Sequence, residues 1–100
     1  MATQTMNPDG RPLDGGRTLT VHTKPACVQC DATKRDLNRR GVRYDTVDIT
    51  RDEDAYNTVV ALGYAAVPVV TVTDADGRHV QDWNGYRPDL IAALYPPREV

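Results

Sequence analysis

The chain has few of the residue types that mark several other classes of protein. Its 100 residues include no phenylalanine, one tryptophan, two histidines and two cysteines. A zinc site usually needs four ligands, and His22 and His79 lie at unsuitable spacings from the cysteines. We therefore expect no bound metal, with a metal-holding module kept as an alternative.

Long apolar runs are absent as well. No stretch is long and apolar enough to span a bilayer, and residues 1–16 lack the apolar run of a signal peptide. We therefore expect a cytoplasmic protein without membrane contact. Thiols stay reduced in that compartment, where a close pair of cysteines is typically redox-active or metal-binding.

The chain also lacks a large excess of either charge. The formal net charge is −2 and the pI is near 5.5, so nucleic-acid binding through bulk charge is not expected. One basic cluster stands out, and we interpret it as a solvated helix face because Asp31 and Asp36 are interleaved with it. Its members are Lys34, Arg35, Arg39, Arg40 and Arg43.

The composition that is present fits one small globular domain, with 40% hydrophobic and 26% charged residues. Residues 1–17 contain Asn-Pro-Asp-Gly and Gly-Gly turn signals and little apolar periodicity. They are predicted to form a flexible N-terminal extension. The folded domain is predicted over residues 18–95, followed by a C-terminal tail at 96–100.

Strands and helices alternate in the predicted domain. Alternating, β-branched segments predict strands at residues 18–23, 42–49, 67–72 and 79–83. Helices are predicted at residues 27–40, from a capping box at 50–53 to about residue 63, and at 88–94. The order β-α-β-α-β-β-α favours an α/β fold with a four-stranded mixed sheet, three helices on its two faces and a parallel first pair of strands.

The motif with the most specific chemistry is Cys27-Val28-Gln29-Cys30, at a strand-to-helix junction. Unpaired N–H groups and the helix dipole favour a thiolate at Cys27, and Lys24 adds positive charge nearby. Cys30 lies one turn later on the same side. We predict that Cys27 is the nucleophile and Cys30 the resolving thiol of a reversible disulfide. A structural disulfide and two buried, inert cysteines are the alternatives.

Pro68 and a tryptophan-containing stretch are two further candidates. From its residues alone, the Val67–Pro68 bond is expected to be trans; a cis bond would present the Val67 backbone to a substrate. Residues 83–88 read W-N-G-Y-R-P and contain the only tryptophan. Trp83 is either a core residue beside a turn or part of a docking edge, because Trp, Tyr and Arg are favoured at interfaces.

Taken together, these motifs resemble those of the NrdH-redoxins, glutaredoxin-like proteins that behave like thioredoxins. The resemblance rests on T-K-P-A-C-V-Q-C at residues 23–30, A-L-G-Y at 61–64, V-P-V-V at 67–70 and W-N-G-Y-R-P at 83–88. It covers about residues 18–95 and implies a glutaredoxin-like thioredoxin fold. The chain departs from many relatives at His22, where they carry Tyr, and at Asn84 and Tyr86, where Ser and Phe are more usual.

The resemblance implies a monomeric electron carrier without a bound cofactor. Such proteins pass electrons from NADPH, through thioredoxin reductase, to the large subunit of class Ib ribonucleotide reductase. The resemblance also implies that Pro68 is cis and that the W-N-G-Y-R-P loop shapes the surface near the cysteines. The residues expected to contact substrate or partner are Lys24, Val28, Gln29, Val67, Pro68, Trp83, Gly85, Tyr86 and Arg87.

Two other functions stay open. Glutathione-dependent glutaredoxins typically carry Pro and an aromatic residue between the cysteines and Gly-Gly-x-x-Asp after the third strand. This chain has Val28-Gln29 and the Trp83 motif instead, which argues against a glutathione site. The other function is a redox-inert interaction module with a thioredoxin-like fold, whose cysteines would show no depressed pKa.

Overall fold

A mixed sheet of five strands forms the centre of the structure, a computed structural model that describes residues 3–96. The strands are β1 (Thr3–Met6), β2 (Thr18–Thr23), β3 (Tyr44–Asp48), β4 (Val69–Thr73) and β5 (His79–Asn84). Their order across the sheet is β1-β3-β2-β4-β5. The pair β2–β3 is parallel, as predicted, and the pairs β1–β3, β2–β4 and β4–β5 are antiparallel.

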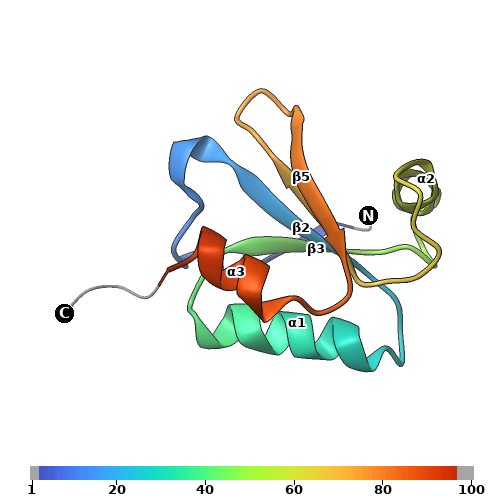
Figure 1. The fold of residues 1–100 in the computed structure, drawn as a ribbon, viewed down its shortest axis with the longest axis horizontal. Coiled ribbons are helices and arrows are strands. Elements are labelled where there is room, and N and C mark those ends of the chain that lie inside the picture. Colours follow the sequence, from blue (N-terminus) through green and yellow to red (C-terminus); the bar gives the residue numbers. More distant parts are fainter. Residues whose placement is uncertain (1–2, 97–100) are drawn as a thin grey trace.

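Helices cover both faces of this sheet. The helices α1 (Val28–Arg39) and α3 (Pro88–Leu94) pack on one face, and α2 (Glu53–Ala61) lies on the other (Figure 1). A short 3-10 helix, η1 (Asp14–Gly16), precedes β2. The predicted α/β class and the order of elements from β2 onward are confirmed. None of the helices within residues 3–96 has the length and apolar character needed to cross a membrane.

The main core lies between the sheet and the layer formed by α1 and α3. Leu19 and Val21 of β2 point to this face because alternate residues of a strand share one face. Leu37 of α1 and Ile91 of α3 meet them, both fully buried. Each such side chain contributes about 1.5–3 kcal/mol on burial, so this layer holds α1 firmly on β2.

The N-terminal segment differs from the flexible extension that its sequence predicted. Residues Thr3–Met6 form β1 along the edge of β3, and Arg11 forms a parallel bridge with Val42. Leu13 is only 4% exposed and belongs to the main core. The backbone groups at the edge of β3 supply the partners that make β1 a strand. The sheet therefore has five strands where four were expected. Residues 97–100 of the predicted tail lie outside the described residues.

The start of α2 also corrects the prediction of a capping box at residues 50–53. The N-cap is Asp52, whose side chain accepts a hydrogen bond of 3.0 Å from the Ala55 N–H. The Thr50 hydroxyl instead donates to the Asp48 carboxylate at 2.6 Å. Because Asp48 engages Thr50, the next suitable side chain along the chain caps the helix.

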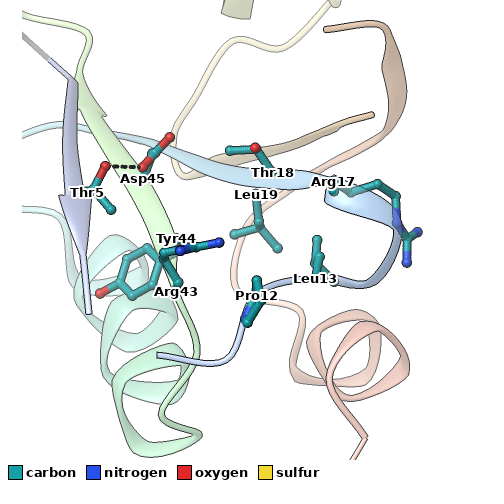
Figure 2. A pocket seen from close by; sticks show the side chains of 10 residues that line it. Thr5, Pro12, Leu13, Arg17, Thr18, Leu19, Arg43, Tyr44 and Asp45 are labelled. Atoms are coloured by element: carbon teal, nitrogen blue, oxygen red, sulfur yellow. Dashed lines mark hydrogen bonds between the residues drawn. The ribbon is translucent and has the colours of Figure 1, made fainter. Parts of the chain in front are cut away.

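The N-terminal segment also forms one wall of an open cleft of about 320 Å³. Figure 2 shows Pro12 and Leu13 beside Leu19, with Tyr44 on the neighbouring strand. The cleft lies at the start of β2, whereas Cys27 follows the end of that strand. The cleft is therefore separate from the cysteine pair.

The packing of Leu13 predicts a stability effect that a flexible extension would not show. Leu13→Ala should lower the free energy of unfolding by about 2–4 kcal/mol, because it removes a buried side chain and leaves a cavity. Urea denaturation followed by circular dichroism measures this loss. The exposed neighbour Asp14 is the control, and Asp14→Ala should change the stability by less than about 0.5 kcal/mol. Equal effects for the two variants would contradict the packing of this segment.

Candidate active site

The redox motif begins where β2 leaves the sheet. Lys24 and Pro25 follow the end of β2, and Ala26 has a φ of 56°, in the left-handed region that few non-glycine residues adopt. This turn of the backbone makes Cys27 the N-cap of α1, with extended φ and ψ of −119° and 107°. The local fold therefore places a sulfur atom, in the role usually filled by a side-chain oxygen, at the N-terminus of a helix.

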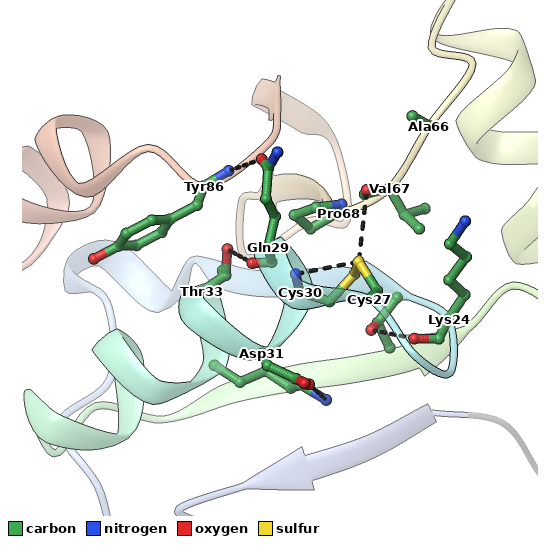
Figure 3. Close-up of a disulfide and its surroundings, with 12 residues drawn as sticks. Lys24, Cys27, Gln29, Cys30, Asp31, Thr33, Ala66, Val67, Pro68 and Tyr86 are labelled. Carbon is green, nitrogen blue, oxygen red and sulfur yellow. Dashed lines mark hydrogen bonds and ion pairs between the residues drawn. A yellow bond between two sulfur atoms is a disulfide. The ribbon is translucent and has the colours of Figure 1, made fainter.

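The two cysteines are joined by a disulfide, with their Cα atoms 5.2 Å apart. The Cys27 Sγ accepts a hydrogen bond of 3.2 Å from the Cys30 backbone N–H (Figure 3). Cys27 is 8% exposed, whereas Cys30 is fully buried. The same N–H group and the helix dipole would stabilise a thiolate on Cys27 in the reduced form. The arrangement therefore suits attack by Cys27 and internal closure by Cys30.

Pro68 lies directly beside this pair, and the Val67–Pro68 peptide bond is cis. This confirms what the family resemblance implied and corrects the trans bond expected from the residues alone. The Cys27 Sγ lies 3.7 Å from the Val67 carbonyl oxygen, which would accept a hydrogen bond from the thiol of the reduced form (Figure 3). Pro68 itself is buried, so the Val67 backbone is the part of this segment that borders the sulfur.

The W-N-G-Y-R-P loop is attached to both the proline segment and the redox motif. The Asn84 side-chain amide donates to the carbonyl oxygens of Ala66, at 2.7 Å, and Pro68, at 3.0 Å. The Gly85 N–H also donates to the Pro68 carbonyl, at 2.8 Å. The Tyr86 N–H donates to the Gln29 Oε1 at 3.1 Å. Three segments far apart in the sequence are thus joined around the disulfide.

Most of the residues predicted to contact partners surround the disulfide. Lys24 and Val67 lie on one side of it in Figure 3, and Gln29 and Tyr86 lie on the other. Val28 is 84% exposed, and Arg87 is exposed and paired with Asp89. Gly85 and Tyr86 are half-buried.

Trp83 is the exception among the predicted contact residues. It is 3% exposed and packs in the main core with residues of α3 and the sheet. The large indole fills space in the core beneath the loop and does not face solvent. This corrects its prediction as a docking residue and agrees with the alternative, a core tryptophan beside a turn.

Asp36 is connected to the site through Tyr86, although the sequence predicted it only as part of a solvated helix face. It is 1% exposed, and its carboxylate accepts hydrogen bonds from Arg39, Arg40 and the Tyr86 hydroxyl. The bond to Asp36 raises the pKa of the Tyr86 phenol, because ionised Tyr86 would face a carboxylate. Its position three residues after Thr33, which is buried, is the signal in the sequence for the inner side of α1.

The histidines do not join the cysteines. His22 lies in β2, within the strand predicted at residues 18–23, and it is buried, with its Nδ1 3.1 Å from the Val69 carbonyl oxygen. Burial lowers its pKa. His79 lies at the far end of β5, where its Nε2 meets the Asp82 carboxylate. Within residues 3–96, no three His, Cys, Asp or Glu side chains converge as metal ligands.

Known proteins of one family are similar to this chain over most of its length. Residues 19–80 match the glutaredoxin family model. The glutaredoxin-like protein NrdH of Salmonella typhimurium is 38% identical over 79 residues, which cover 79% of this chain and 90% of that protein. The chain belongs to the glutaredoxin family. This family of thiol–disulfide oxidoreductases uses a cysteine pair of the kind formed by Cys27 and Cys30.

Solved structures of this family and its relatives agree with the fold. The glutaredoxin-like NrdH-redoxin of Escherichia coli superposes with a TM-score of 0.69 at 34% identity, covering 81% of this chain and 99% of that one. Thioredoxin of Fasciola hepatica, at 15% identity, superposes with a TM-score of 0.63 over 79% of this chain and 77% of its own. The glutaredoxin-like chain thus has the expected thioredoxin fold, extended by β1.

The close approach of Gly85 to Gln29 predicts a measurable cost for a side chain at that position. Gly85 has a φ of 84°, and a Cβ there would lie 3.0 Å from the Gln29 Oε1. Gly85→Ala should therefore lower stability through backbone strain, about 1 kcal/mol, and through loss of the Gln29–Tyr86 hydrogen bond, about 1 kcal/mol more.

Gly77→Ala is the matched control for this variant. Gly77 has a φ of 82°, and a Cβ there would meet no atom within 4 Å. Urea denaturation of both variants separates the backbone cost, which they share, from the contact with Gln29, which only Gly85→Ala disturbs. Equal losses of stability would show that Gln29 moves aside freely.

Proposed function

We propose that the protein is a dithiol electron carrier that reduces protein disulfides through Cys27 and Cys30. The observation that carries this proposal is the position of the Cys27 sulfur at the N-terminus of α1, more exposed than the buried Cys30. A sulfur in that position is favoured as a thiolate and can be reached by a partner, whereas Cys30 is reached only from within the protein.

The proposed reduction has two balanced steps. The Cys27 thiolate attacks one sulfur of the partner disulfide, forming a mixed disulfide and releasing the partner's other sulfur as a thiolate. Cys30 then loses its proton and attacks the Cys27 Sγ. This forms the Cys27–Cys30 disulfide and releases the second partner thiolate. Two electrons have passed to the partner, and the released thiolates take up protons.

The surface around the disulfide supports docking of a folded partner. Val28 and Gln29 lie exposed between the cysteines, and Lys24 and Val67 border them. We propose that these residues, with Gly85, Tyr86 and Arg87 of the adjoining loop, contact the partner. Pro68 supports the surface from below by holding the Val67 backbone beside Cys27.

We propose that NADPH, through thioredoxin reductase, supplies the electrons and that the large subunit of class Ib ribonucleotide reductase receives them. The support is the likeness to NrdH proteins, including the Escherichia coli NrdH-redoxin, which has a thioredoxin-like activity profile. On this proposal the protein is a monomeric, cytoplasmic carrier that binds no cofactor and cycles between a dithiol and a disulfide.

The choice of reductase is tested by NADPH consumption. Oxidised protein should be reduced with thioredoxin reductase and NADPH, and not with glutathione, glutathione reductase and NADPH. Turnover with the glutathione system alone would make the protein a glutathione-dependent glutaredoxin in practice. Failure in both systems, with unreactive thiols, would leave a redox-inert module.

The separate roles of the cysteines predict different outcomes for two serine variants. Cys27→Ser should abolish reduction of insulin disulfides, because no accessible nucleophile remains. Cys30→Ser should still attack once and accumulate a mixed disulfide, which mass spectrometry detects as a covalent adduct. Insulin reduction by Cys27→Ser, or an adduct on Cys30, would contradict the assignment.

A further inference from the structure

Tyr86 is held to α1 at two separate points. Its backbone N–H donates to the Gln29 Oε1 at 3.1 Å, and its hydroxyl donates to the Asp36 Oδ2 at 2.9 Å. Gln29 and Asp36 are seven residues apart, which is about two turns of the helix. Figure 3 shows the Tyr86 ring extending along α1 from the end that carries the disulfide. One residue thus connects the redox end of α1 to its last turn.

The hydroxyl end of Tyr86 is attached to a buried, charged anchor. Asp36 is 1% exposed, and its other oxygen accepts from Arg39 at 2.8 Å and from Arg40 at 2.9 Å. Arg40 also donates to the Tyr95 carbonyl oxygen at 3.3 Å, which joins the network to the end of α3. Hydrogen bonds to an ionised carboxylate are stronger than neutral ones, so the Tyr86 hydroxyl has a firm attachment.

The backbone end of Tyr86 acts on an otherwise exposed side chain. Gln29 is exposed and lies between the two cysteines. A free glutamine there would exchange among rotamers. The bond from the Tyr86 N–H instead holds the Gln29 side chain. Gln29 belongs to the first turn of α1, in which the Cys30 N–H donates to the Cys27 sulfur.

We propose that Tyr86 is a positioning residue for the redox pair: its hydroxyl, bound to buried Asp36, holds its backbone on Gln29 and so keeps the first turn of α1 ordered around Cys27. Loss of the hydroxyl loosens this turn and weakens the stabilisation of the Cys27 thiolate. The inference rests on the proposed role of Cys27 as nucleophile, and it adds a residue that does not touch the reacting sulfur.

The experiment compares the reactivity of reduced wild-type protein and Tyr86→Phe. Alkylation of Cys27 by iodoacetamide is followed by mass spectrometry from pH 4 to pH 9. In Tyr86→Phe the thiol pKa should rise, and the rate below that pKa should fall about threefold, the low end of the coupling between contacting residues. The ring remains, so packing of the loop is retained.

Tyr44→Phe is the matched control. The Tyr44 hydroxyl donates to the Asn38 Oδ1 of the same helix at 2.8 Å, and Tyr44 is buried. Tyr44→Phe therefore removes a tyrosine hydroxyl that is hydrogen-bonded to α1, and it leaves the first turn of that helix untouched. It should lower stability and leave the pH profile of alkylation unchanged. Equal profiles for Tyr86→Phe and wild type, or equal shifts in both variants, would overturn the positioning role.

A second variant tests the other end of the connection. Gln29→Ala, at an exposed position, should reproduce the slower alkylation, and adding Tyr86→Phe to it should cause no further change. Additive effects would mean that Tyr86 does not act through Gln29, and an unchanged rate in Gln29→Ala would overturn the inference even if Tyr86→Phe failed to fold. Wild-type Cys27 that reacts no faster than Cys30 would instead count against the proposed function itself.

Discussion

The hydrogen bond from the Cys30 N–H to the Cys27 sulfur depends on Cys27 being the residue that caps α1. If the helix began one residue earlier or later, the sulfur would leave the region where unpaired N–H groups converge. The left-handed Ala26 sets that start, because it turns the chain sharply between the end of β2 and the helix. The redox chemistry of the protein therefore rests on a backbone conformation outside the Cys-x-x-Cys motif.

The surface around the disulfide is assembled from segments that are distant in the sequence. The Asn84 side-chain amide and the N–H groups of Gly85 and Tyr86 bond the loop to residues 66–68 and to Gln29. Asn84 and Tyr86 therefore supply, through their own side chains, part of the hydrogen bonding that keeps the loop beside the cysteines.

The N-terminal segment illustrates how a small domain gains structure beyond its redox module. Its strand β1 covers the edge of β3, and Leu13 fills a place in the main core. A domain of this size buries a limited share of its surface, so each added core residue matters. The curated Salmonella relative matches 79 residues of this chain, and β1 extends the sheet on the side away from β4 and Pro68.

Local patterns determined much of this fold. Alternation over residues 18–23, the proline at the start of α3 and the Cys-x-x-Cys motif after a strand act over neighbouring residues, so the sequence alone identified these elements and the reactive pair. No local pattern identified β1 or Leu13, because β1 is ordered by the distant edge of β3 and Leu13 by the main core.

Tertiary structure alone decided which polar groups are buried. Helical spacing places Asp36 on the inner side of α1, but only the packing of distant segments encloses it, and the same holds for Trp83 at the end of β5. The cis bond before Pro68 followed from family resemblance and not from its neighbours. A sequence determines the elements through short-range spacing, whereas the contacts that complete the site depend on which distant segments the sheet brings together.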